Sequence, residues 1–423
     1  MASCAEERTT VAQDTSAPGL AAARDRPTQP SLLVFSDDWG RHPSSCQHLI
    51  RQLLPKYRVC WVNTIGMRPP RLDVYTIRRG AEKLRIWFRS RQQPGDSNNG
   101  NLTVHNPRMW PWIARRHDRW LNRHLLELQL RPVLDAAASP VVAITTVPNV
   151  ADLIDRLPVA RWVYYCVDDF SNWKGMDAAA IKSMESQLVQ RADVIVAASP
   201  KLQESLRKRG RDALLLTHGV DLEHWEVARS ALVASQPVAE LEGLESPLVL
   251  FWGSINWQLD VEFLRRLSAE MPSGTIALVG PKSDVDPRVF DLPRLVWIPP
   301  VPYDRLPQLA AKADVLVMPY LNGPGLDESQ PLKLKEYLAA GKPAVVRDLP
   351  ANRVWSEALD LVRTPGEFSE RVRERLLEGL PASQANARRP LANESWADKA
   401  RQFERFAIIG RTASDNKEHC DVA

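Results

Sequence analysis

Two glutamates, Glu328 and Glu336, lie eight positions apart around the predicted start of a helix. Pro331 fits the first position of a helix, where its missing N–H costs nothing. Residues 332–340 are good helix formers, and Gly341 is the expected C-terminal stop. Glu328 is therefore expected on the loop before the helix, and Glu336 inside the helix.

Free backbone N–H groups are expected between these two carboxylates, near Ser329, Leu332 and Lys333. Free amides at a helix N-terminus attract a phosphate group, and a flanking carboxylate can accept hydrogen bonds from sugar hydroxyls. The alternative is that the glutamates only cap the helix and carry surface charge. The proline before the helix and the Gly-Lys-Pro turn into an apolar strand favour a site for a phosphorylated sugar.

Short apolar runs alternate with helical stretches, which is typical of parallel sheets covered on both faces. In the first half, strands are expected over residues 31–35, 57–62, 141–145, 162–166, 194–198 and 213–216. The pattern restarts at Leu248, with strands over 276–279, 295–298, 315–318 and 344–346. These runs predict an α/β protein with two doubly wound, Rossmann-like domains facing a cleft. Ligands in such sheets bind outside the carboxyl ends of the strands.

The predicted divisions of the chain follow changes in composition and periodicity. They are a disordered leader (1–30), a first domain (31–222), a linker (223–246), a second domain (247–390), a C-terminal helix (391–410) and a tail (411–423).

Acidic and aromatic side chains are also expected at strand ends of the first domain. Asp38, Trp39 and Arg41 follow its first strand, and Asp168 follows the strand over 162–166. Asp168 could orient a sugar hydroxyl or accept its proton, and Trp39 could stack on a sugar ring. The alternatives are that one aspartate of each adjacent pair caps the following helix and that Trp39 packs in the core.

Composition limits the partners of the chain. The net charge of +4 over 423 residues does not argue for nucleic acid. Between Arg78 and His124, however, the chain contains eleven Lys and Arg and three acidic residues, with tryptophans between them. Such a stretch can contact an anionic membrane surface or a phosphorylated acceptor, or it can be an ordinary solvated face. The five cysteines lack paired spacing, and no apolar run reaches the length of a bilayer crossing. We therefore expect a cytoplasmic protein with at most peripheral membrane contact.

The segment around the two glutamates resembles the donor-site signature of GT-B glycosyltransferases of glycosyltransferase family 4, also called group 1. That signature is Glu, seven residues, Glu, then Ala-x-Gly-x-Pro-Val, and it ends here at Ala340, Gly341, Pro343 and Val345. The resemblance covers about residues 31–410. It includes His-Gly-Val-Asp at 218–221, the segment 313–320 and Ser-Trp at 395–396. Within the family, the chain is most similar to bacterial polysaccharide and teichuronic-acid enzymes.

The resemblance implies a role for each half and for several residues. The first domain would bind the acceptor, the second would bind a nucleotide-sugar donor, and the last helix would cross back onto the first domain. Glu336 would bind the ribose, and Glu328 would face the transferred sugar. Backbone amides near Leu332 and Lys333 would hold the diphosphate, and Gly253 would open the donor loop.

One departure concerns that donor loop. Family members commonly carry Arg and Lys after its glycine, whereas residues 253–263 here contain Asn256 and Gln258 and no basic residue. Lys333 and Lys282 are the expected substitutes.

The function expected from these features is retaining, metal-independent transfer of a sugar from a nucleotide to a glycan or lipid-linked acceptor. The role would be in cell-surface polysaccharide biosynthesis, with neither cofactor nor metal. Two alternatives stay open: a sugar-nucleotide epimerase, and a non-catalytic protein that binds a nucleotide or glycan.

Overall fold

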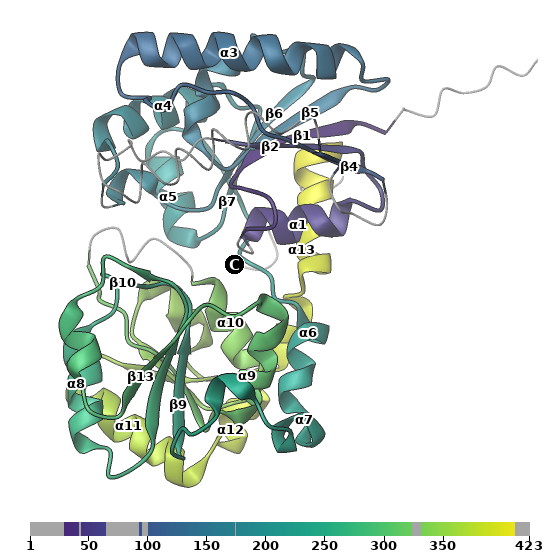
Figure 1. The fold of residues 1–423 in the computed structure, drawn as a ribbon. Coiled ribbons are helices and arrows are strands. Elements are labelled where there is room, and N and C mark those ends of the chain that lie inside the picture. The colour runs from purple at the N-terminus through teal and green to yellow at the C-terminus, as the bar shows by residue number, and fades with distance from the viewer. Residues whose placement is uncertain are drawn as a thin grey trace, which may run out of the picture.

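The computed structural model describes residues 29–41, 44–64, 93–94, 100–173, 175–323 and 331–410. These residues form two α/β domains, each built on a largely parallel sheet (Figure 1). This confirms the predicted fold class. No helix among the described residues is long and apolar enough to cross a membrane.

The first domain contains an eight-stranded sheet of order β3-β4-β2-β1-β5-β6-β7-β8. Its neighbouring strands are parallel except β3 and β4, which are antiparallel. The strands are β1 (Ser31–Ser36), β2 (Val59–Asn63), β3 (Gln93–Pro94), β4 (Leu102–His105), β5 (Val141–Thr145), β6 (Arg161–Cys166), β7 (Val194–Ala197) and β8 (Leu214–Leu215). The α-helices are α1 (Ser45–Leu53), α3 (Arg116–Asp135), α4 (Ala178–Arg191) and α5 (Pro200–Lys208).

The second domain contains a six-stranded parallel sheet of order β13-β11-β9-β14-β15-β16. Its strands are β9 (Leu248–Trp252), β11 (Thr275–Val279), β13 (Leu295–Ile298), β14 (Val315–Met318), β15 (Ala344–Arg347) and β16 (Asp360–Val362), beside the short pair β10 (Ile255–Asn256) and β12 (Lys282–Ser283). Its helices are α8 (Val261–Glu270), α9 (Leu306–Lys312), α10 (Leu332–Ala339), α11 (Pro365–Glu378) and α12 (Ala382–Ala387).

Alternating side chains of β9 fill two separate cores on the two faces of this sheet. Leu248, Leu250 and Trp252 lie in one core, whereas Val249 and Phe251 lie in the other. A continuous apolar run is therefore required, because a strand covered on both faces exposes no side chain to water.

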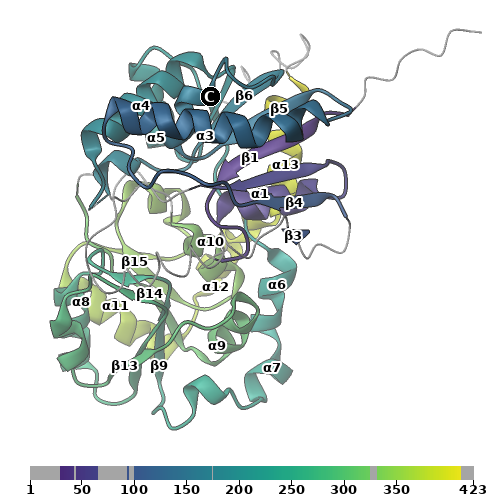
Figure 2. The same cartoon turned by 45° about the horizontal axis from the view of Figure 1, so that its top comes forward.

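Two connections join the domains. The first contains α6 (Leu222–Glu226) and α7 (Ala231–Ser235), where the sequence predicted only a linker. The second leads into α13 (Trp396–Phe403), which continues as a π-helical turn over Glu404–Ile409. Phe403 and Ile408 of this segment lie in the core of the first domain. In both views α13 lies beside α1 (Figures 1 and 2).

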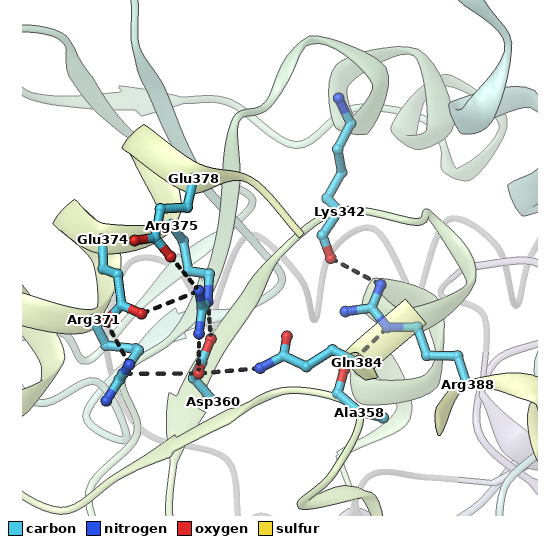
Figure 3. Close-up of polar contacts among 9 residues, drawn as sticks. All are labelled: Lys342, Ala358, Asp360, Arg371, Glu374, Arg375, Glu378, Gln384 and Arg388. Atoms are coloured by element: carbon cyan, nitrogen blue, oxygen red, sulfur yellow. Dashed lines mark hydrogen bonds and ion pairs between the residues drawn. The ribbon is translucent and has the colours of Figure 1, made fainter. Parts of the chain in front are cut away.

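Polar contacts tie α11 and α12 to β16 and to the loop after α10. Arg375 of α11 binds Asp360 at the start of β16 through two hydrogen bonds of 2.7 and 3.0 Å, and Gln384 of α12 adds one of 3.1 Å (Figure 3). The buried guanidinium of Arg388 donates to the carbonyls of Ala358 and Lys342, at 3.0 and 2.9 Å (Figure 3). The two bonds of Arg388 hold the loop after α10 against the segment before β16, so the C-terminal end of α10 is fixed.

Candidate functional site

Helix α10 follows β14 after a connecting loop and carries the donor-site candidates. The structure corrects its start by one position: Pro331 is the N-cap, with φ −65° and ψ 119°, and the helix begins at Leu332. At the other end, Gly341 has φ +74°, as expected for a helix stop. Arg229 donates to the carbonyl of Ala339 at 2.9 Å. A cation at the C-terminal end of a helix interacts favourably with the negative end of the helix dipole. The positive end, at the N-terminus of α10, can attract an anion.

Glu336 is the centre of the described part of this site. Both of its carboxylate oxygens accept a hydrogen bond: Oε2 from Trp252 Nε1 at 3.0 Å, and Oε1 from the Tyr303 hydroxyl at 3.2 Å. Burial raises the pKa of Glu336, while the two donors and the charge of Lys333 lower it. A carboxylate offers about four lone-pair positions, so two protein donors leave acceptor capacity for a ligand.

Aromatic rings surround this carboxylate. Trp252 stacks on Trp225 with 5.1 Å between ring centroids, and it meets Tyr337 edge to face at 4.3 Å. Tyr303 stacks on His224 at 4.3 Å. Sequence analysis did not single out Trp252 or Tyr303. The available signal was their position: Trp252 ends β9 immediately before Gly253, and Tyr303 follows the carboxyl end of β13.

Lys333 brings a cation to the donor loop. A Cβ built on Gly253 would lie 2.1 Å from the Lys333 ammonium, so the two residues are in direct contact. Gly253 also has φ +132°, which side-chain-bearing residues rarely adopt. The ammonium lies 4.4 Å from the centroid of the Phe251 ring and donates to the Tyr320 hydroxyl. The positive charge therefore stands beside the loop that lacks its own basic residues.

The rest of this loop is tied to the segment after β14. Asp260 N donates to Pro319 O at 2.8 Å, and Leu321 N donates to Gln258 O at 2.7 Å. Asp260 caps α8. Lys282, the second expected substitute, lies 3.7 and 3.8 Å from the centroids of the Phe290 and Trp297 rings. It lies on β12, which pairs with β10 in the donor loop.

Glu328 and Ser329 lie outside the described residues. Leu332, Lys333 and Glu336 are described, and the first two occupy the first turn of α10. Their assignments as donor-binding residues therefore stay predictions.

In the first domain, the sequence left open which of Asp168 and Asp169 caps the following helix. Asp169 caps the short 3₁₀ turn at Phe170–Asn172 and accepts from Ser171 N. Asp168 accepts from the backbone N–H of Asp169 at 2.8 Å and from Trp173 Nε1 at 3.1 Å. Asp168 is thus held at the carboxyl end of β6 by two donors.

The residues after β1 point in different directions. Asp38 pairs with Arg41 at 3.3 Å, and the side chain of Asp38 is half-buried while that of Arg41 is exposed. Trp39 packs edge to face on Trp61 at 4.7 Å, so packing contributes to its position. Asp37, which sequence analysis did not select, is turned inward.

The carboxylate of Asp37 accepts hydrogen bonds from three neutral groups. The donors are the Ser36 and Ser44 hydroxyls, at 2.9 and 3.0 Å, and Gln47 Nε2, at 3.0 Å. Burial raises its pKa. A carboxylate with neutral hydrogen-bond donors and a raised pKa is suited to proton exchange.

Side chains at the carboxyl ends of the two sheets meet. His48 of α1, the helix that follows β1, lies edge to face with Tyr303 at 5.6 Å and stacks on Trp396 at 5.0 Å. Ser45 Oγ lies 2.8 Å from His218 Nδ1. Lys335 of α10 binds the carbonyl of His218 and the carboxylate of Glu394. Helix α1 of the first domain and helix α10 of the second therefore border one junction, beside Tyr303.

Among the described residues, no three His, Cys, Asp or Glu side chains converge in a way that could hold a metal ion.

The fold and the helix-borne site define a two-domain GT-B architecture. Similar solved structures include sucrose-phosphate synthase from Thermosynechococcus elongatus, with TM-score 0.64 and 15% identity over 89% of this chain and 97% of that one. Another is the Anabaena protein HepE in complex with UDP and glucose, with TM-score 0.60 and 14% identity over 89% and 98%.

Residues 246–377 match the family model of Glycosyl transferases group 1. This matched segment includes β9 through most of α11. A 179-residue stretch is 32% identical to the Bacillus subtilis (strain 168) glycosyltransferase TuaH, which is named for teichuronic acid biosynthesis. That stretch spans 40% of this chain and 44% of the relative, less than half of each.

Proposed function

We propose that this protein is a retaining, metal-independent glycosyltransferase that moves a sugar from a nucleotide donor to a glycan or lipid-linked acceptor. The observation that carries the proposal is the pairing of Glu336 with Lys333 on α10. A carboxylate for ribose hydroxyls and an ammonium for a diphosphate lie within one turn of the same helix. Both lie inside the segment that matches the group 1 family.

The acceptor would meet the donor at the junction of the two domains. Asp168 and Asp37 are the first-domain carboxylates that we assign to the acceptor hydroxyl, with Trp39 and Arg41 beside them. Positive groups near the diphosphate stabilise the leaving nucleotide, and negative groups near the ring stabilise an oxocarbenium-like transition state. TuaH is named for teichuronic acid biosynthesis, which supports a cell-surface polysaccharide as the product, made in the cytoplasm.

A screen of the full chain against UDP-, GDP-, ADP- and dTDP-sugars tests this function. We expect hydrolysis or transfer with one donor, unchanged by EDTA, and an anomeric product of retained configuration by NMR. Absence of both binding and turnover with every donor would reject the proposal. Conversion of the donor sugar to an epimer without acceptor would identify an epimerase, and binding without turnover a non-catalytic protein.

An anionic membrane is the proposed surface at which the acceptor is met. Helix α3 lies on the outer face of the first domain (Figures 1 and 2). It presents Trp120, which is 54% exposed, and Arg116, while Trp112 and Arg115 are exposed just before it. Arginine and tryptophan together suit the charged and interfacial layers of a bilayer.

Arg119 does not belong to this surface, although it lies in the same basic stretch. It binds both oxygens of Asp152, at 2.8 and 2.6 Å, as well as Gln187. The double variant R115E/R116E should therefore lose flotation with anionic liposomes while binding to neutral liposomes stays unchanged. Equal flotation of wild type with both lipids would remove the membrane proposal without affecting the transfer reaction.

A further inference from the structure

Tyr303 connects the carboxylate of Glu336 to α6, in the first connection between the domains. Its hydroxyl donates to Glu336 Oε1 at 3.2 Å, and it receives a hydrogen bond from Trp225 Nε1 of α6 at 3.3 Å. On the other oxygen of the carboxylate, Trp252 Nε1 donates at 3.0 Å. Each oxygen of Glu336 thus has one donor from an aromatic side chain.

The direction of these hydrogen bonds follows from the chemistry of the groups. An indole N–H can only donate, so the Tyr303 oxygen is the acceptor for Trp225. Its single proton is then available for Glu336. Burial and the nearby Glu336 charge raise the pKa of Tyr303, so the phenol keeps this proton. Tyr303 therefore stabilises the ionised carboxylate, which is the form that accepts two hydroxyls.

Packing holds the Tyr303 ring in place. One face stacks on His224, with 4.3 Å between centroids and 7° between planes. The ring of His48, from the first domain, approaches at 5.6 Å and 62°. With the hydroxyl fixed by Trp225 and the ring fixed by two histidines, the donor to Glu336 has little freedom to move.

We propose that Tyr303 is a positioning residue of the donor site. Together with Trp252 it orients the Glu336 carboxylate so that its remaining lone pairs face the 2′- and 3′-hydroxyls of a ribose. This inference rests on the proposed function, because it assumes that Glu336 binds a nucleotide. It adds a specific consequence: Tyr303 contributes to the preference for ribose over a sugar without those hydroxyls.

The test is Y303F, which removes the hydroxyl and keeps the ring. The control is Y164F, because Tyr164 in the first domain also donates to a glutamate, Glu185, at 2.9 Å. Calorimetric titration would use whichever of UDP, GDP, ADP and the ribo-form of dTDP binds the wild type most tightly, beside the matching 2′,3′-dideoxyribonucleotide. We expect Y303F to bind the ribonucleotide about tenfold more weakly and the dideoxynucleotide within about twofold of wild type.

The control Y164F should leave both affinities unchanged. The milder variant W225F, which removes the donor to the Tyr303 oxygen, should weaken only the ribonucleotide, by about threefold. It also provides a second measurement if Y303F does not fold.

Two results would overturn the inference. Equal losses for the ribo- and dideoxy-forms in Y303F would show a merely structural role, and unchanged affinity for both would show none. Either result leaves the proposed function standing, because the wild type still binds. Failure of the wild type to bind any of the four nucleotides would instead reject the proposed function and this inference with it.

Discussion

The carboxyl edges of the two sheets both present buried carboxylates, but they stabilise them differently. In the second domain, Glu336 accepts from two aromatic donors, and Lys333 contributes a nearby positive charge. In the first domain, Asp37 accepts from two hydroxyls and an amide, all neutral. Burial raises the pKa of both groups.

This difference separates two kinds of recognition. A carboxylate beside a cation suits a ligand with both hydroxyls and phosphates, which describes a nucleotide donor. A carboxylate among neutral donors suits a neutral hydroxyl whose proton must be moved. The family model matches residues of the second domain, which is the side with the cation. Substitutions on the two edges should therefore have different effects.

The largest expected effect is that of E336Q. The amide keeps the shape of the side chain but loses the charge that accepts hydroxyl protons. We expect nucleotide affinity to fall about a hundredfold, since charge-assisted hydrogen bonds contribute about 1.5–3 kcal/mol. Titration with the preferred nucleoside diphosphate measures the effect. An affinity within about twofold of wild type would show that Glu336 does not bind the donor.

The first-domain counterpart is D37N. Transfer to the acceptor should fall about thirtyfold, because the amide cannot take a proton, while donor affinity stays unchanged. D38N is the matched control, since the Asp38 side chain pairs only with Arg41 among the bonds described here. Steady-state rates at saturating donor provide the measurement. Equal losses in both variants would contradict the assignment of the inward aspartate.

K333M should weaken donor binding about tenfold, through loss of one charge-assisted contact. The loss should appear with the nucleoside diphosphate and vanish with the uncharged nucleoside, because the ammonium is expected to meet only phosphate. K282M is the control, since Lys282 lies over two rings instead of beside Gly253. A larger effect of K282M would move the diphosphate site to β12.

The last prediction concerns the contact between the two edges, where the expected change is in stability instead of affinity. Burial lowers the pKa of His48 from 6.5 to about 4, with Arg51 and His224 acting in the same direction and Asp221 against them. As pH falls below 6.5, His48 binds a proton in the unfolded chain but not in the folded state. The free energy of unfolding therefore decreases until about pH 4.

The H48F variant tests this contact, because it keeps a ring against Trp396 but cannot titrate. Between pH 7 and pH 5, the wild type should lose about 2 kcal/mol more unfolding free energy than H48F. Urea unfolding at both pH values measures the difference. Parallel losses in the two proteins would show that His48 is not the group responsible.

Most of the strands were predictable, because strands buried on both faces need continuous apolar runs. Strand β4 was missed, since three of its four residues are exposed or half-buried. Helix α3 was missed for another reason. Its buried stripe begins with Asp118 and Asn122, which bind the Trp110–Trp112 segment. Because these core positions are polar, the helical repeat of apolar residues cannot be recognised at the start of α3.

Local signals in the sequence were sufficient to predict α10 and to place Lys333 and Glu336 on it. A proline before a helix, a glycine after it and charged residues inside it act over a few residues, so they can be read in order along the chain. They indicated the class of ligand and the domain that binds it.

Only the tertiary structure decided which groups surround that carboxylate and which aspartate of the first domain turns inward. Trp252 and Tyr303 are 84 and 33 residues from Glu336 along the chain, and β9 and β13 bring them to it. Asp37 and Asp38 are adjacent and chemically identical, yet one accepts three hydrogen bonds and the other lies at the surface. Tertiary packing sets the orientation of a side chain and the distant residues that contact it. A local sequence pattern contains no information about either.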